Sequence, residues 1–319
     1  MSIKKLEILK ILYLGYKIRI TDEIISKKYV EKKIRCPVHL SIGQEIPSAV
    51  LNVLLDKKDF AISYHRSHAH YLAKGGSIKK LIAEIYGKET GCSKGVGGSM
   101  HLIDLKNNFL GSTAIVSNSI PVGVGYAYPM LNKKNPGKVC VYLGDASCEE
   151  GVFFESLNIS ILKKLPLIFF CENNGYSVYS PLKNRQPKDR KLFNLARSFQ
   201  INSFHFSSFN PLKLYLGLKK ILNNDNFPVF IEVETYRHYE HCGPNIDDNL
   251  GYRSKKESTK WLKKDPLIFL ENFVIKNNLL SKFQINDLKY SITKEVEDAF
   301  LFAEKSKPLK YKDYLRLSK

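Results

Sequence analysis

Two polar pairs at the ends of apolar runs are the residues of this chain best suited to metal and phosphate chemistry. The apolar run 139–143 ends at Gly144-Asp145, and the run 167–170 ends at Glu-Asn-Asn, with Asn174 last. A helical pattern separates the two runs, so the segment reads as strand, helix, strand. Parallel α/β sheets bind their ligands at the carboxyl ends of the strands. We therefore expect these polar residues to meet at one edge of a sheet.

Asp145 and Asn174 offer hard oxygen atoms, which suit Mg²⁺, a cation that takes few protein ligands and is shared with substrate phosphates. The backbone N–H groups at the start of the helix after Asp145 form a natural cradle for phosphate. In the alternative interpretation these residues have only structural roles: Asp145 caps this helix, and the two asparagines form a turn. Because both pairs occur together at strand ends, we favour a metal and phosphate site.

Seven of the eight histidines fall in loops that are rich in glycine or that follow a predicted strand. They are His39, His65, His68, His70, His101, His238 and His241. Core packing does not account for this concentration, so we expect the loops to share a cleft. A zinc site is conceivable in such a cleft, but the spacings match no zinc signature. Arg66 is the best candidate for a diphosphate ligand, because its planar guanidinium matches phosphate oxygens.

The composition narrows the class of protein. The chain has 319 residues and a net charge of +19, spread as short pairs such as Lys4-Lys5 rather than as a long basic run. This pattern disfavours nucleic-acid binding. The six cysteines show no CxxC and no metal spacing. There is no signal-peptide pattern and no run near the ~18 apolar residues of a membrane span. We therefore expect a cytoplasmic protein that binds neither nucleic acid nor membrane.

Short strands alternate with helices, which predicts an α/β fold with a parallel sheet flanked by helices. Strands are expected at 60–64, 139–143, 167–170 and 228–234. The chain shows no internal repeat and no linker, so residues 1–319 are expected to form a single domain. Residues 1–35 are expected to form an amino-terminal arm of two amphipathic helices. Residues from about 262 to 319 are expected to form a lysine-rich helical extension.

A series of segments resembles, in order and nearly in spacing, the alpha subunit of the decarboxylating component of 2-oxoacid dehydrogenase complexes. The segments are HLSIGQE, SYHRSHAHYLAKGG, GCSKGVGGSMHL, STAIVSNSIPVGVG, GDASCEEG, KLPLIFFCENNGYSVYSP, PVFIEVETYRHYEHCGP and GYRSKKE. Gly-Asp followed, after about thirty residues, by Asn-Asn is similar to the thiamine diphosphate signature. The resemblance runs from about residue 5 to 315. It implies a thiamine diphosphate-binding fold, with thiamine diphosphate and Mg²⁺ as cofactors.

The resemblance also assigns roles to residues. Asp145 and Asn174 would bind Mg²⁺ through their side chains, and Tyr176 would bind it through its backbone carbonyl. The residues that would contact the cofactor are His39, His65, Arg66, Ala114, Val116, Gly144, Asp145, Ala146, Ser147, Asn174 and His241. His241 would lie over the reacting carbon of the thiazolium ring. The resemblance implies that His241 and His68 are catalytic.

The implied reaction is oxidative decarboxylation of a 2-oxoacid with transfer of the acyl group to a lipoyl group. In this family the glutamate that activates the cofactor comes from a separate beta subunit, and neither Glu45 nor Glu155 matches that role. We therefore expect an α₂β₂ heterotetramer, with a lipoyl acyltransferase as a further partner.

The chain departs from the family pattern at two places that bear on function. His65 stands where the family usually has tyrosine, and the loop after His241 is longer than in pyruvate-type subunits. These departures leave open a carboligase or transketolase-like half enzyme that transfers a two-carbon unit. The net charge of +19 leaves open, more remotely, a non-catalytic basic binding protein.

Overall fold

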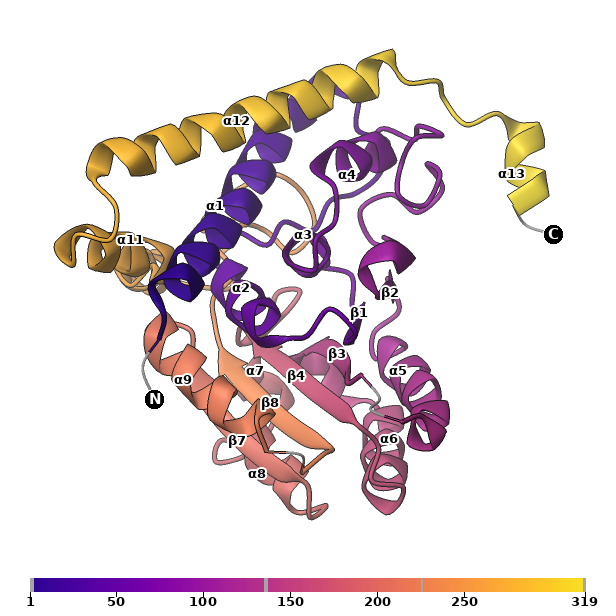
Figure 1. The fold of residues 1–319 in the computed structure, drawn as a ribbon, viewed down its shortest axis with the longest axis vertical. Coiled ribbons are helices and arrows are strands. Elements are labelled where there is room, and N and C mark those ends of the chain that lie inside the picture. Colours follow the sequence, from indigo (N-terminus) through magenta and orange to yellow (C-terminus); the bar gives the residue numbers. More distant parts are fainter. Residues whose placement is uncertain (1–2, 135–136, 225, 318–319) are drawn as a thin grey trace.

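A sheet of six parallel strands, in the order β2-β1-β3-β4-β8-β7, lies at the centre of the computed structural model, which describes residues 3–134, 137–224 and 226–317 (Figure 1). The strands are β1 (Phe60–Ser63), β2 (Phe109–Ser112), β3 (Val139–Gly144), β4 (Leu167–Asn173), β7 (Asn202–Ser207) and β8 (Val229–Glu234). A small antiparallel pair, β5 (Tyr176–Ser177) and β6 (Ser180–Pro181), follows β4. The predicted α/β fold with a parallel sheet is confirmed.

Helices cover both faces of this sheet (Figure 1). They are α1 (Lys5–Lys28), α2 (Glu45–Leu54), α3 (His68–Ala73), α4 (Ile78–Ile85), α5 (Ser119–Ala127), α6 (Gly151–Leu162), α7 (Leu182–Arg185), α8 (Leu192–Arg197), α9 (Pro211–Leu222), α10 (Lys255–Leu262), α11 (Pro266–Lys276), α12 (Lys282–Lys305) and α13 (Tyr311–Leu317). Among the described residues, no helix is both long enough and apolar enough to cross a membrane.

Two hydrophobic cores lie on opposite faces of the sheet, and β3 contributes to both. Cys140 and Tyr142 belong to the core beneath α1, α2, α9, α11 and α12. Val139, Val141 and Leu143 belong to the core beneath α5, α6 and α8. Successive side chains of a strand point to opposite faces, so a strand buried on both sides is apolar throughout. This is why the central strands appear in the sequence as continuous apolar runs.

The amino-terminal arm differs from the prediction, because α1 continues from Lys5 to Lys28 where two helices were expected. Gly15, in the middle of α1, weakens the helical pattern in the sequence. Its lack of a side chain serves packing instead, since a Cβ there would lie 2.7 Å from Cδ1 of Leu267 in α11. The expected carboxyl-terminal helices are present as α11, α12 and α13 within the described residues.

Phe230 in β8 offers a test of the core. Its side chain is fully buried, and its ring centroid lies 5.8 Å from that of Phe153 in α6. We expect Phe230→Ala to lower the free energy of unfolding by about 3–5 kcal/mol, because it removes apolar contacts and leaves a cavity. Phe283 in α12 is 79% exposed, so Phe283→Ala should change it by less than about 0.5 kcal/mol. Chemical denaturation measures both, and equal losses would contradict this description of the core.

Candidate functional site

A cavity of about 160 Å³ lies at the carboxyl ends of β1, β3 and β4. It is lined by the residues predicted to contact a cofactor or a metal, namely His39, His65, Arg66, Ala114, Val116, Gly144, Asp145, Ala146, Ser147, Asn174, Tyr176 and His241. Tyr64, Met100, Ser177 and Val178, which sequence analysis missed, line it too. Residues that are far apart in the chain therefore meet in one place, and their binding roles stay predictions.

Asp145 and Asn174 follow neighbouring strands. Asp145 begins a short 3₁₀ turn (Asp145–Glu149) directly after β3 and is 2% exposed. The Asn174 side chain is held at both ends: its amide nitrogen donates to Oε1 of Gln44 at 3.0 Å, and its oxygen accepts from the backbone N–H of Tyr176 at 3.0 Å. Two side-chain oxygens are thus fixed at the same edge of the sheet, as a site for a hard cation requires.

Arg185 of α7 forms an ion pair with Asp145, and sequence analysis gave no sign of this contact. Its guanidinium donates to the carboxylates of Asp145 and Glu149, and its side chain is 11% exposed. Burial raises the pKa of Asp145, while Arg185 acts in the opposite direction. The positive charge of Arg185 therefore lies at the carboxylate predicted to bind the metal.

Arg66 is a buried cation, 2% exposed, and forms no ion pair with any carboxylate among the described residues. Its guanidinium donates to the backbone carbonyls of Leu40, at 2.7 Å, and His241, at 3.0 Å. Burial, together with the nearby Arg237, lowers the pKa of Arg66 to about 10, so it stays charged at neutral pH. A buried charge without a partner is costly, which indicates that the cavity is prepared for an anion.

Three imidazoles, those of His39, His65 and His241, cluster beside Arg66. Their ring centroids lie 4.7, 5.0 and 5.1 Å apart. Burial is the main cause that lowers all three pKa values below the usual range for histidine, with Arg66 adding to it, and the pKa of His241 falls to about 3. The three rings are therefore neutral at pH 7. The expected shared cleft holds for these three histidines.

His68 lies outside this cavity, fully buried in α3. Its Nδ1 lies 2.7 Å from Oδ1 of Asp22 and its Nε2 lies 2.8 Å from Oγ of Ser99, which in turn accepts from the backbone N–H of His39. Both of its ring nitrogens are thus occupied and it does not line the cavity, and the catalytic role expected of His68 stays a prediction. We interpret His68 as a residue that positions the loop carrying His39.

The loop that carries His241 is fixed by two buried arginines. Arg237 donates to the carbonyls of Tyr239 and Val178, and Arg253 donates to the carbonyls of Arg237 and His238. These bonds tie the loop after β8 to the segment after β4. The position of His241 in the cavity therefore depends on these contacts to the backbone. The sequence predicted that His241 belongs to the site, but not the contacts that hold it there.

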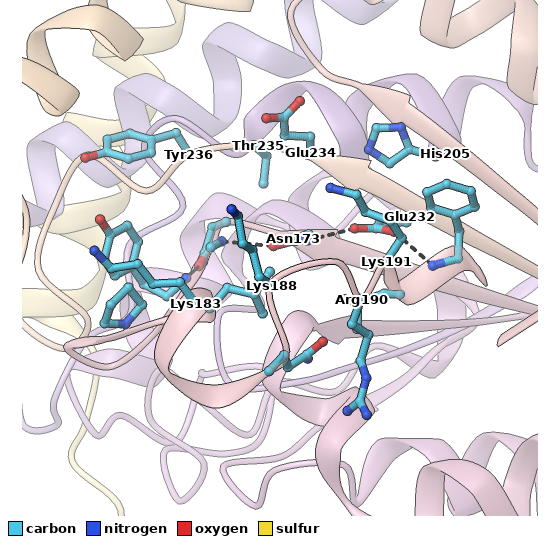
Figure 2. A pocket seen from close by; sticks show the side chains of 18 of the residues that line it. Asn173, Lys183, Lys188, Arg190, Lys191, His205, Glu232, Glu234, Thr235 and Tyr236 are labelled. Atoms are coloured by element: carbon cyan, nitrogen blue, oxygen red, sulfur yellow. Dashed lines mark hydrogen bonds between the residues drawn. The ribbon is translucent and has the colours of Figure 1, made fainter. Parts of the chain in front are cut away.

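A larger cavity of about 740 Å³ adjoins the first and shares Asn174 and Tyr176 with it. Figure 2 shows Lys183 and Lys188 on one side of this cavity and Glu234 and Tyr236 on the strand-end side. Lys183 lies in α7, the short helix that also carries Arg185. This helix thus borders the larger cavity and carries the arginine that bonds to Asp145 of the smaller one.

Comparisons with known proteins agree with the site. Residues 16–312 match the family described as "Dehydrogenase E1 component". The pyruvate dehydrogenase E1 component subunit alpha of Rickettsia felis is 32% identical over 271 residues, 84% of this chain and 82% of that protein. The subunit of the same name from Porphyra purpurea is 32% identical over 295 residues, 89% and 85% of the two chains. A chloroplastic alpha-3 subunit from Oryza sativa is 32% identical over 301 residues, 90% and 70% of the two chains.

This chain belongs to the dehydrogenase E1 component family, as an alpha subunit of the kind found in thiamine diphosphate-dependent 2-oxoacid dehydrogenases. The resemblance that the sequence motifs indicated is confirmed.

The neutral histidines predict a loss of stability in acid. Their pKa values are lower in the folded chain than the ~6.5 of an unfolded one, so the unfolded state binds more protons and stability falls as pH drops below about 6.5. For His241, whose folded pKa is about 3, the slope is up to ~1.4 kcal/mol per pH unit. His241→Asn should be less sensitive than the wild type between about pH 6.5 and pH 5, when the free energy of unfolding is measured by denaturation.

His205→Asn serves as the matched control, because His205 is an exposed histidine of β7 outside the cluster. It should keep the wild-type pH dependence. An unchanged slope in His241→Asn would show that His241 is not buried as described.

Proposed function

We propose that this chain is the alpha subunit of a Mg²⁺- and thiamine diphosphate-dependent enzyme that decarboxylates a 2-oxoacid oxidatively and transfers the acyl group to a lipoyl group. One observation carries most of the support. Arg66, a buried cation with no acidic partner among the described residues, and the oxygens of Asp145 and Asn174 line one cavity. A diphosphate with its metal ion would provide the anion for Arg66 and the cation for the two oxygens.

The donor set of the cavity fits this cofactor. Asp145, Asn174 and the carbonyl of Tyr176 would hold Mg²⁺. Arg66 would bind the diphosphate through its planar guanidinium, together with the backbone N–H groups of Ala146 and Ser147. These residues come from the turns after β1, β3 and β4. The strand ends thus supply both the cation site and the anion site.

The ring end of the cofactor would be oriented by backbone from another loop. Ala114 and Val116 line the cavity, and Oγ of the neighbouring Ser117 donates to the carbonyl of Ser147 at 3.0 Å. This hydrogen bond couples the loop after β2 to the turn after β3. When bound, the cofactor supplies a thiazolium that accepts the electron pair released as CO₂ leaves. His241, neutral at pH 7, would orient the substrate and move a proton beside it.

The cavity supports the need for a second chain. Among the described residues no glutamate lines it. Glu45 is fully buried and paired with Arg19, and Glu155 lies exposed on α6. Neither lines the cavity. We propose that a beta subunit provides that glutamate in an α₂β₂ heterotetramer, that a lipoyl acyltransferase accepts the acyl group, and that pyruvate, named in the relatives, is the first substrate to test.

The test of this function uses the full chain with its beta subunit, Mg²⁺, thiamine diphosphate and a lipoyl domain. We expect CO₂ release to be coupled to acylation of the lipoyl domain. The same mixture without the lipoyl domain, but with aldehyde or sugar acceptors, should yield no carbon–carbon bond formation by NMR. Carboligation without acyl transfer would contradict the proposal.

The metal assignment makes a direct prediction about Asp145. We expect Asp145→Ala to abolish Mg²⁺-dependent binding of thiamine diphosphate, because the substitution removes one of the two side-chain oxygens at the predicted metal site. Calorimetric titration of the variant together with its beta partner measures the affinity. Asp189→Ala, at an exposed position in the loop after α7, is the control and should bind as the wild type does. Unchanged affinity in Asp145→Ala would rule out the assignment.

Substitution of Arg185 is expected to have the opposite effect on cofactor binding. Its guanidinium bonds to Oδ2 of Asp145, so a metal ion at this carboxylate has to compete with it. Removing an ion pair worth about 1 kcal/mol should tighten binding of Mg²⁺ with thiamine diphosphate about fivefold in Arg185→Met. Lys183→Met removes one charge from the same helix without touching Asp145, and should leave the affinity unchanged. Weaker binding in Arg185→Met would show instead that Arg185 binds the cofactor.

A further inference from the structure

The ring nitrogens of His39, His65 and His241 converge on one point. One nitrogen from each ring can be chosen such that all three lie within 4.8 Å of one another. Three ligands of a tetrahedral ion with bonds of 2.0–2.1 Å lie about 3.4 Å apart. Small rotations of the rings would therefore bring the three nitrogens to bonding distance around a single ion.

Among the described residues, the rings of His39, which is buried, and of His65 and His241, which are half-buried, have no hydrogen-bond partners. Nδ1 of His39, a residue that is 5% exposed, is buried without a partner. The buried His238, outside this cluster, also has an Nδ1 without a partner. In contrast, His68 and His70 have both ring nitrogens within hydrogen-bond distance of a serine and a carboxylate. A buried polar atom without a partner is costly, so Nδ1 of His39 supports a ligand at the point where the three rings converge.

The chemistry of the ligand follows from the donors. Neutral imidazole suits late first-row divalent ions such as Zn²⁺, Co²⁺ and Ni²⁺, and Mg²⁺ prefers oxygen. Three histidines leave a fourth position open for water or an anion. Arg66 and Arg237 lie nearby and oppose a cation, which favours hydroxide or phosphate as that fourth ligand. Asp145 and Asn174 offer oxygen atoms instead. The cavity therefore contains three imidazoles that suit a transition-metal ion and two oxygen donors that suit Mg²⁺.

We propose that His39, His65 and His241 form a binding site for a late first-row transition-metal ion such as Zn²⁺. The ion would occupy part of the cavity assigned to the cofactor, so each would exclude the other. The site goes beyond the proposed function and does not require it, since it depends on the three imidazoles alone.

The test uses Co²⁺ as a visible probe on the full chain without added thiamine diphosphate. We expect one Co²⁺ per chain, with the intense visible bands of a four-coordinate ion. His65→Tyr should weaken binding at least about tenfold, and His205→Asn, which removes an exposed histidine, should not change it. His65→Gln should weaken binding equally. The melting temperature of this variant shows whether a loss of binding comes from misfolding. Anomalous scattering at the cobalt edge should place the ion between the three rings.

Two outcomes would overturn the inference: Co²⁺ binding that is equally tight in folded His65→Tyr and His65→Gln, or an anomalous peak elsewhere in the molecule. Titration with Mg²⁺ and thiamine diphosphate, with the beta partner present, separates the two proposals. A chain that binds this cofactor but not Co²⁺ contradicts the transition-metal site alone. A chain that binds Co²⁺ at the three histidines but not the cofactor contradicts the proposed function alone.

Discussion

Between β3 and β4, Gly144 lies opposite Glu172, so the two strands end at nearly the same level of the sheet. This register is fixed by two cores, because alternate residues of each strand are buried on opposite faces and a shift by one residue would exchange them. Asp145 and Asn174 follow the two strand ends and line the cavity together. The site is thus a consequence of strand pairing, and the flanking helices act by holding that pairing in place.

The charged residues of the cavity lack the partners that a complete binding site would give them. In the part of the chain that the structure describes, Arg66 is buried without an acidic partner. Asp145 is paired with an arginine from a short helix that borders a second cavity. A bound diphosphate would satisfy Arg66, and a divalent cation would replace Arg185 at Asp145. The chain also lacks a glutamate in the cavity among its described residues. These features together favour half of an active site, which a second subunit completes.

The sequence predicted the parts of the fold that are encoded locally. The runs that became β3 and β4 were recognisable because strands buried on both faces are apolar throughout. The edge strands β2 and β7 were missed. In β7 only Ser203 is fully buried, and the strand includes polar side chains, so it shows no continuous apolar run. The continuity of α1 was missed because a glycine inside a helix weakens its pattern in the sequence. The reason for Gly15 is its close packing against Leu267, which lies far away in the sequence.

The sequence could predict which residues belong to the candidate site, but not the contacts that each of them makes. Motif positions identified most of the residues that line the cavity, but they could not distinguish His241, which lines it, from His68, which is buried outside it with both ring nitrogens occupied. The contact of Arg185 with Asp145 was not predictable, because it joins segments 40 residues apart without a motif. Environment, unlike residue type, depends on the three-dimensional fold.

The most direct test of the central claim is a crystal structure of the chain with its beta subunit, Mg²⁺ and thiamine diphosphate. The account predicts Mg²⁺ between Asp145 and Asn174, the diphosphate against Arg66, and Arg185 displaced from Asp145. A cofactor bound elsewhere, or bound while Arg185 remains on Asp145, would contradict it.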